Sequence, residues 1–166
     1  MSRPAPLFLP PRQLIEFTRF FADEVRGGCY PYVDFDPDER WHQRIYRDRR
    51  VDVWLISWLP SQGTELHDHG GSAGSFTVLS GTLTEAVVAD GRARDRQRPA
   101  GESVGFGPRY VHDVRNLDQT PAVSVHAYSP PLTSMTYYDL ADGKLAPIRT
   151  LVTDDPEADV AAERAS

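Results

Sequence analysis

The chain has 166 residues, of which 40% are hydrophobic, and a formal net charge of -6, values that suit one soluble domain with a single core. The acidic balance argues against a nucleic-acid-binding surface, which is normally basic. Cys29 is the only cysteine, so an internal disulfide and a cysteine-based metal site are both excluded, and we expect a small, partly buried apolar residue there.

No apolar run approaches the roughly 20 residues that a bilayer-spanning helix needs. The N-terminal stretch is too rich in proline for a signal peptide. We therefore expect a cytoplasmic protein, a monomer or small homo-oligomer, with no membrane or nucleic-acid partner.

An amphipathic helix is predicted near the N-terminus. Apolar residues recur at helical spacing through residues 13–26, before a Gly-Gly pair; they are Leu14, Phe17, Phe21 and Val25. A second short helix is expected over residues 38–46. Residues 1–50 are thus expected to form a helical segment packed on the rest of the chain.

From residue 51 onward the sequence consists of short runs rich in Val, Ile, Thr and aromatic residues, separated by Gly, Pro and Asp turns. Many short strands at near-regular spacing indicate an all-β sandwich or barrel over residues 51–150. The expected strands are residues 51–58, 75–79, 82–88, 103–106, 111–114, 123–128 and 135–140. The Arg-rich residues 92–98 are expected to be a solvated hairpin tip, and residues 151–166 a polar tail.

Three histidines form a candidate metal site. His67 and His69 lie two residues apart, so on an extended strand both rings point to one face, where His112 from a neighbouring strand can join them. Three neutral imidazoles leave coordination positions open, as catalysis requires. Imidazole suits iron, zinc, copper and nickel alike, so ligand type alone leaves the metal open. The alternative is that His67 and His69 are surface residues of a hairpin.

The segments around these histidines resemble the two cupin motifs. Residues 63–69 with 76–81 resemble the first motif, and residues 107–116 resemble the second. Most cupins place a fourth ligand, a Glu, shortly after the His-x-His pair, where this chain has Ala73 and Gly74. The resemblance implies a cupin fold, that is, a double-stranded β-helix or jelly-roll barrel, preceded by N-terminal helices.

A second polar row occurs near the end of the predicted barrel. Ser124, His126 and Tyr128 alternate with apolar residues, so they share one face of a strand. Buried polar groups need partners, and a hydrogen-bonded chain leading to the metal site would supply them. The alternative is a polar strand face open to solvent.

Together these blocks resemble the cysteine dioxygenase family of thiol dioxygenases over about residues 51–139. The most specific block is Ser124-Val-His126-Ala-Tyr128-Ser-Pro-Pro131. The resemblance implies that His67, His69 and His112 hold iron(II), and that Ser124, His126 and Tyr128 form a catalytic relay. It also implies that the enzyme oxidises a small thiol, L-cysteine, with O2 to cysteine sulfinic acid. Animal members join the tyrosine to a nearby cysteine; the matching position is Gly74, so we expect no such crosslink, as in bacterial members.

The partner of the substrate carboxylate has three candidates. The family places an Arg or a Gln before the strand that leads to the metal motif. Counting back from Trp58 without gaps places this position at His42, and a shift of two residues places it at Arg44. The fork shape of a guanidinium matches a carboxylate and so favours Arg44. Arg109, three residues before His112, is another possible partner.

Other functions stay open at this point. One is a dioxygenase for 3-mercaptopropionate or another small thiol; relatives that act on it place an Arg beyond the tyrosine, and residues 135–138 contain none. The other is a non-redox metal cupin, either an isomerase or a sensor, since fold alone does not determine function.

Overall fold

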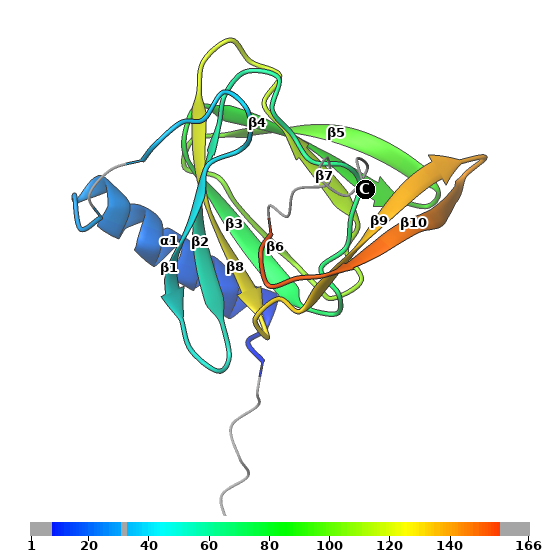
Figure 1. Cartoon of the computed structure of the whole chain (residues 1–166), viewed down its shortest axis with the longest axis horizontal. Helices are drawn as coiled ribbons and strands as arrows, with labels where there is room; N and C mark the ends of the chain where they lie inside the picture. The colour runs from blue at the N-terminus through cyan, green and yellow to red at the C-terminus, as the bar shows by residue number, and fades with distance from the viewer. Residues whose placement is uncertain (1–7, 31–32, 157–166) are drawn as a thin grey trace, which may run out of the picture.

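The computed structural model describes residues 8–30 and 33–156, which form one helix and ten strands. The largest sheet has five strands in the order β1-β2-β8-β3-β6, and the other two sheets are β5-β4-β7 and β9-β10. Figure 1 shows the five-stranded sheet facing the two smaller sheets. The strands are β1 (His42–Arg47), β2 (Asp52–Trp58), β3 (Ala73–Ser80), β4 (Thr82–Ala89), β5 (Arg92–Pro99), β6 (Ser103–Phe106), β7 (His112–Arg115), β8 (Ala122–Ser129), β9 (Ser134–Ala141) and β10 (Lys144–Val152).

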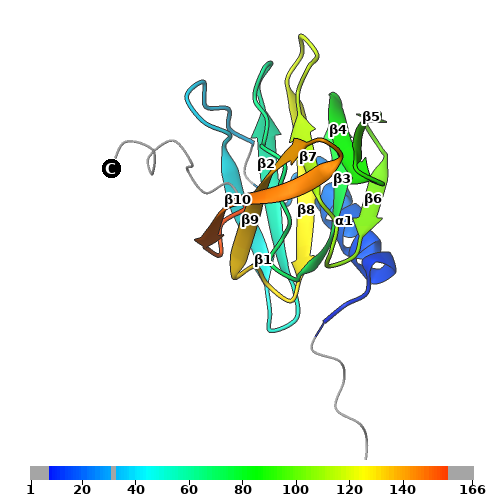
Figure 2. The same cartoon turned by 90° about the vertical axis from the view of Figure 1, so that its right-hand side faces the viewer.

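Helix α1 (Pro11–Arg26) packs against β3, β6 and β8 on the outer face of the five-stranded sheet (Figures 1 and 2). A proline at its first position and Gly28, which follows the C-cap residue with a φ of 80°, fit the preferences of helix termini. Its buried face includes Leu14 and Phe21, together with Thr18, whose hydroxyl lies 3.0 Å from that of Ser75. The predicted helix is therefore confirmed. No helix within the described ranges is long and apolar enough to cross a bilayer.

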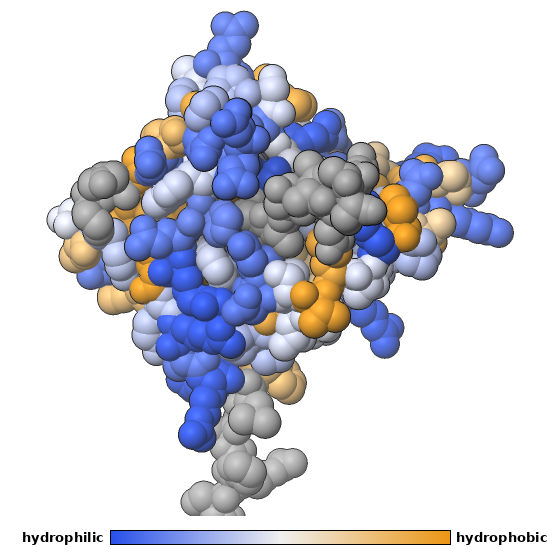
Figure 3. Space-filling view, in the orientation of Figure 1, coloured by the Kyte–Doolittle hydropathy of each residue, from blue (hydrophilic) through white to orange (hydrophobic). Residues whose placement is uncertain are grey.

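Two hydrophobic cores lie on opposite faces of the five-stranded sheet. Strand β2 supplies both, because side chains alternate along a strand. Trp54 and Trp58 belong to the inner core between the sheets, whereas Val53 and Leu55 belong to the outer core under α1. Figure 3 shows a mostly hydrophilic face with small apolar patches. The inner core is the one that surrounds the candidate site.

The strands predicted from residue 51 onward are confirmed, but three local predictions are wrong. Residues 42–47 form edge strand β1 instead of a helix, because pairing with β2 satisfies their backbone groups. Residues 92–98 belong to strand β5, which pairs with β4 along its whole length while its side chains stay largely exposed. Cys29 is exposed rather than partly buried.

Strand β10 is an element that sequence patterns did not predict. It pairs with β9 and continues to Val152, two residues into the expected tail. Its mixture of charged, polar and apolar residues has no clear alternation, so its strand form depends on β9. Residues 157–166 of the expected tail lie outside the described residues.

Candidate metal centre

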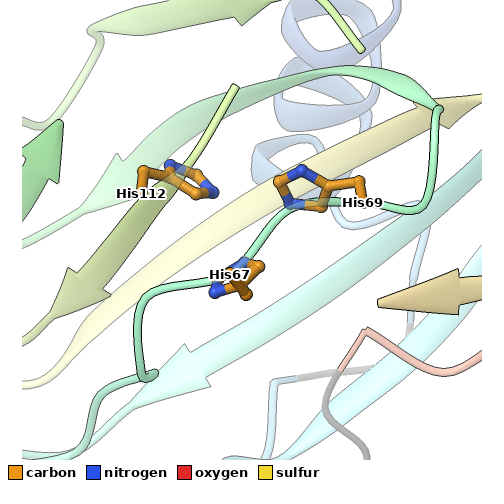
Figure 4. Close-up of side chains that lie close together, drawn as sticks. All are labelled: His67, His69 and His112. Atoms are coloured by element: carbon orange, nitrogen blue, oxygen red, sulfur yellow. The ribbon is translucent and has the colours of Figure 1, made fainter. Parts of the chain in front are cut away.

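The three histidines predicted as ligands meet inside the barrel. His67 lies in the loop between β2 and β3 and forms a two-way backbone bridge with His112 at the start of β7, with N–O distances of 3.0 and 3.1 Å. His69 is two residues further along the same loop. One ring nitrogen from each histidine lies within 4.8 Å of the other two, and Figure 4 shows the rings around a common point. All three side chains are buried, so a surface hairpin is excluded.

The electrostatic environment keeps the site ready to bind a cation. Burial, together with the neighbouring His112, lowers the pKa of His67 to about 3. Burial also lowers the pKa of His69 well below its usual value, with His67 as the next contribution. These two rings are therefore neutral near pH 7 and can offer lone pairs.

Hydrogen bonds at Nδ1 decide which nitrogen of two rings faces the centre. His67 Nδ1 lies 2.7 Å from the carbonyl oxygen of Glu65, to which it donates, and this leaves Nε2 unprotonated. His112 Nδ1 lies 2.8 Å from Oε1 of Glu85. His69 Nδ1 is buried and has no hydrogen-bond partner among the described residues.

This donor set fits a divalent transition metal. It is the only group of three or more potential ligands that the described part of the chain brings together. Ala73 and Gly74 occupy the positions where most cupins place a fourth ligand, and neither has a ligating side chain. Three imidazoles could therefore bind one face of an ion and would leave coordination positions for other molecules, as a catalytic metal needs.

Aromatic rings form the walls of the site. Phe106 stacks on His69 with ring centroids 4.8 Å apart, and Tyr128 also stacks on His69 at 5.1 Å. The ring of Tyr137 from β9 lies 6.0 Å from that of His67. Their burial keeps water away from the histidines, which strengthens electrostatic interactions there.

The polar row on β8 is a buried hydrogen-bonded chain. Ser124 Oγ lies 2.8 Å from His126 Nε2, and the Tyr128 hydroxyl lies 3.4 Å from His126 Nδ1. All three residues are buried, so the alternative of a solvent-exposed face is wrong. Burial lowers the pKa of His126 to about 3, so this ring is neutral and carries a single N–H.

Trp58 determines the direction of hydrogen-bond donation along the Ser124, His126 and Tyr128 row. Its indole Nε1, which can only donate, lies 2.8 Å from Ser124 Oγ. The serine hydroxyl can then donate to His126 Nε2, and His126 Nδ1–H can donate to the Tyr128 oxygen. In this arrangement the hydroxyl hydrogen of Tyr128 is directed to another acceptor.

The three candidate partners of the substrate carboxylate lie in different places in the structure. Arg44 and His42 on β1 lie opposite Trp54 and Ile56, so both face the inner core. Arg44 stacks 4.6 Å from the Trp54 ring centroid. Arg109 is exposed and has no hydrogen bond or ion pair with the described residues.

The segment after β10 provides acidic partners for the two inner candidates. Arg44 Nη2 lies 3.0 Å from Asp154 Oδ2, and His42 Nε2 lies 2.9 Å from Asp155 Oδ2. Both contacts join residues more than a hundred positions apart, so no local sequence signal predicted them.

Sequence reasoning missed two charged residues near the histidines. Arg40 donates to the carbonyl of Gly63, lies 5.6 Å from the Trp58 ring centroid, and contributes to lowering the pKa of His67. Glu85 contacts His112 directly. Burial alone would raise the pKa of Glu85, but hydrogen bonds from His112, Tyr110 and Arg98 lower it overall. The sequence did offer a signal for Glu85. It lies two residues after Leu83 in a predicted strand, so the acid shares a face with a hydrophobic residue.

Comparison with known proteins identifies the family. Residues 24–141 match the family model described as cysteine dioxygenase type I. The chain belongs to this family. Cysteine dioxygenase type 1 of zebrafish (Danio rerio) is 30% identical over 105 residues, covering 57% of this chain and 52% of that protein. The human (Homo sapiens) protein of the same name is 27% identical over 171 aligned positions, covering 81% of this chain and 83% of that protein. The zebrafish match thus spans about half of that relative's length.

Solved structures confirm the cupin fold of this cysteine dioxygenase family member. A double-stranded β-helix protein from Klebsiella pneumoniae aligns with a TM-score of 0.53 and 20% identity, covering 77% of this chain and 94% of that one. A structure of oxalate oxidase aligns with a TM-score of 0.55 and 14% identity, covering 66% of this chain and 60% of that one. At such low identities the likeness concerns the fold.

Proposed function

We propose that this chain is an iron(II)-dependent thiol dioxygenase that converts L-cysteine and O2 to cysteine sulfinic acid. The observation that carries the proposal is the position of Tyr128. Its hydroxyl ends a buried hydrogen-bonded row, and its ring stacks on His69, one of three convergent histidines. Membership of the cysteine dioxygenase type I family supports iron over the other metals that imidazole binds.

The proposed reaction needs one metal and two small molecules. His67, His69 and His112 would hold iron(II), which when bound supplies adjacent positions for the thiol sulfur and O2, so that their reaction becomes effectively intramolecular. Both oxygen atoms of O2 end on the sulfur, so the conversion of thiol to sulfinic acid needs no further reductant.

The chain's own residues would orient the reactants and control a proton. Tyr128 would donate its hydroxyl hydrogen to the reacting oxygen or position the thiol. His126 and Ser124 would keep that hydroxyl in place, as the hydrogen bonds of 3.4 and 2.8 Å indicate. The buried aromatic rings of Phe106 and Tyr137 would exclude water from the reacting groups.

Arg44 is our proposed partner for the substrate carboxylate. It faces the inner core, and a guanidinium can bind a carboxylate through two parallel hydrogen bonds. Its ion pair with the carboxylate of Asp154, at 3.0 Å, supports this choice. His42 is the second candidate and Arg109, at the surface, the third. A cytoplasmic location and a monomer or small homo-oligomer stay predictions from the sequence.

Product analysis tests the function. Protein loaded anaerobically with iron(II) is mixed with L-cysteine and isotopically labelled O2, and the product is identified by mass. We expect cysteine sulfinic acid with both oxygens labelled, and none from metal-free or zinc-loaded protein. Absence of a sulfinate with every small thiol tested would contradict the proposal and favour a non-redox metal cupin.

A second candidate substrate, 3-mercaptopropionate, is favoured by one observation. Arg149 on β10 lies opposite Tyr137 and places its guanidinium carbon 4.4 Å from that ring's centroid, while Tyr137 lies 6.0 Å from His67. Hairpin pairing thus brings an arginine to the wall formed by β9, where residues 135–138 supply none. Comparing kcat/KM for the two thiols would separate the candidates, and we expect the value for L-cysteine to be higher.

A further inference from the structure

Glu85 is a fully buried carboxylate beside the site but outside the group of three histidines. Its exposed fraction is 0%. Oε1 accepts hydrogen bonds of 2.8 Å from the Tyr110 hydroxyl and from His112 Nδ1. Oε2 accepts a hydrogen bond of 2.9 Å from Nε of Arg98 and forms an ion pair with Nη2 of the same residue at 2.8 Å. Because four donors surround it, the burial of this charge is compensated.

Strand register creates this arrangement. Glu85 on β4 lies opposite Val114 of β7 and Arg96 of β5. His112 and Arg98 are each two residues from those partners, so they are its diagonal neighbours on the same face, within reach of a long side chain. The sheet therefore places an acid between the histidine on one side and an arginine on the other.

A second acid holds the arginine. Arg98 Nη1 lies 2.6 Å from Oε1 of Glu102, which is only partly buried. A continuous row of hydrogen-bonded side chains thus runs from Glu102 through Arg98 and Glu85 to His112. Each member restricts the orientation of the next, and His112 is the end that faces the site.

We propose that Glu85 is a positioning residue that keeps the proton of His112 on Nδ1 and aims Nε2 at the metal. An imidazole can offer a lone pair from Nε2 only when the proton is on Nδ1, and a carboxylate at Nδ1 fixes both the tautomer and the ring orientation. The proposal rests on the proposed function in that the three histidines bind a metal. It does not depend on thiol oxidation.

Metal affinity of two matched variants tests the proposal. Glu85→Gln removes the charge next to His112 at nearly constant volume, whereas Glu102→Gln removes a charge from the same arginine without touching His112. The dissociation constants for iron(II) and cobalt(II) are measured anaerobically by chelator competition, without thiol. We expect Glu85→Gln to weaken binding roughly 10- to 100-fold and to change the visible spectrum of bound cobalt(II). The Glu102→Gln variant should stay within about a factor of two of the unaltered protein.

A role limited to stability predicts a different result. In that case Glu85→Gln would lower the melting temperature, but the folded variant would bind metal as tightly as the unaltered protein, and this outcome would overturn the proposal. Protein that makes no sulfinate, yet loses metal affinity in Glu85→Gln, would contradict the dioxygenase function and support the role of Glu85.

The tautomer of His112 in the unaltered, metal-free protein gives a second test that needs no variant to fold. Nitrogen-15 chemical shifts of the ring distinguish a proton on Nδ1 from one on Nε2. We expect the Nδ1–H form, and a ring found as the Nε2–H form would refute the assignment.

Discussion

At the scale of single residues, Tyr128 has the clearest chemical role to test. Its hydroxyl bonds His126 Nδ1 at 3.4 Å and its ring stacks on His69. Tyr128→Phe keeps the ring and removes the hydroxyl, so we expect unchanged iron content and thiol-dependent oxygen uptake at least tenfold slower. Oxygen consumption with L-cysteine measures the effect.

The matched control is Tyr46→Phe, which removes a hydroxyl that donates to Asp48, on the face of the sheet that carries α1 and lies away from the site. Its oxygen uptake should equal that of the unaltered protein. If Tyr128→Phe also retains full uptake, the relay has no part in the reaction.

Asp52 at the start of β2 gives a prediction about stability and pH. One oxygen accepts from Trp54 Nε1 at 3.0 Å, and the other is buried with no partner among the described residues. Burial raises the pKa of Asp52 from 3.8 to about 6, so the folded state binds the proton more tightly than the unfolded state. The contribution of Asp52 to stability is therefore largest below about pH 4 and is lost as the pH rises through about 6.

Asp52→Asn removes this titration and keeps an acceptor for Trp54. We expect the variant to be more stable near pH 8, by at most about 3 kcal/mol, and the difference to vanish near pH 4. Urea unfolding at both pH values measures it. A variant less stable than the unaltered protein at about pH 8 would show that the charge of Asp52 is compensated.

At the scale of elements, the packing of β3 against β6 depends on Gly74. A Cβ at this position would lie 2.3 Å from Cζ of Phe106. Phe106 cannot move easily, because its ring is stacked on His69 on one side and on Tyr110 on another, with centroids 4.8 Å apart in each pair. Because Gly74 has no side chain, the Phe106 ring has room to stack on His69, a predicted metal ligand.

Gly74→Ala should accordingly cost about 1–3 kcal/mol and weaken metal binding, because Phe106 must shift against His69. Adding Phe106→Leu to this variant should restore part of both losses, since the smaller side chain leaves room. Gly107→Ala is the control, because a Cβ there has no neighbour within 4 Å. Thermal unfolding and metal titration measure the effects. If the losses in the double variant equal the sum of those in Gly74→Ala and Phe106→Leu alone, the explanation is contradicted.

The segment after β10 contacts strand β1 through an ion pair. The half-buried Arg44 pairs with the exposed Asp154, and its guanidinium lies over Trp54. If Arg44 binds the substrate carboxylate, Arg44→Met should raise KM for L-cysteine by roughly 10- to 100-fold, which corresponds to the loss of a charged hydrogen bond. KM for cysteamine, which lacks a carboxylate, should not change.

Arg109→Met is the matched control for that experiment and should leave both KM values unchanged. Asp154→Asn should lower KM for L-cysteine, because it removes the carboxylate that competes for Arg44. If KM for L-cysteine rises in Arg109→Met and stays unchanged in Arg44→Met, the carboxylate partner is Arg109, the surface candidate.

At the scale of the whole molecule, helix α1 and the metal centre lie on opposite faces of one sheet. Leu14 is fully buried in the outer core, whereas the histidines adjoin the inner core. Leu14→Ala should cost about 2–5 kcal/mol of stability without changing the metal affinity of the molecules that stay folded. Phe20→Ala, at an exposed position of the same helix, should change stability by less than about 0.5 kcal/mol. A loss of metal affinity in Leu14→Ala would show that the outer core supports the site.

Local patterns in the sequence determined much of this organisation. Helical spacing predicted α1, and runs of Val, Ile, Thr and aromatic residues between turns predicted the strands from β2 to β9 apart from β5. The spacing of His67, His69 and His112 predicted rings that meet. The row of Ser124, His126 and Tyr128 was also visible, because side chains two apart on one strand share a face. Such signals are readable because each depends on neighbours only a few residues away, or on a motif with fixed spacing.

Tertiary structure alone decided which distant groups meet. The contacts of Glu85 with His112, of Arg44 with Asp154 and of Trp58 with Ser124 each depend on the register between strands or segments that are far apart in the chain. Strands β1, β5 and β10 likewise owe their form to pairing with a neighbour. A sequence records the period of each strand, but the offset between two strands is set by how both pack on a common core, so these contacts appear only in the folded molecule.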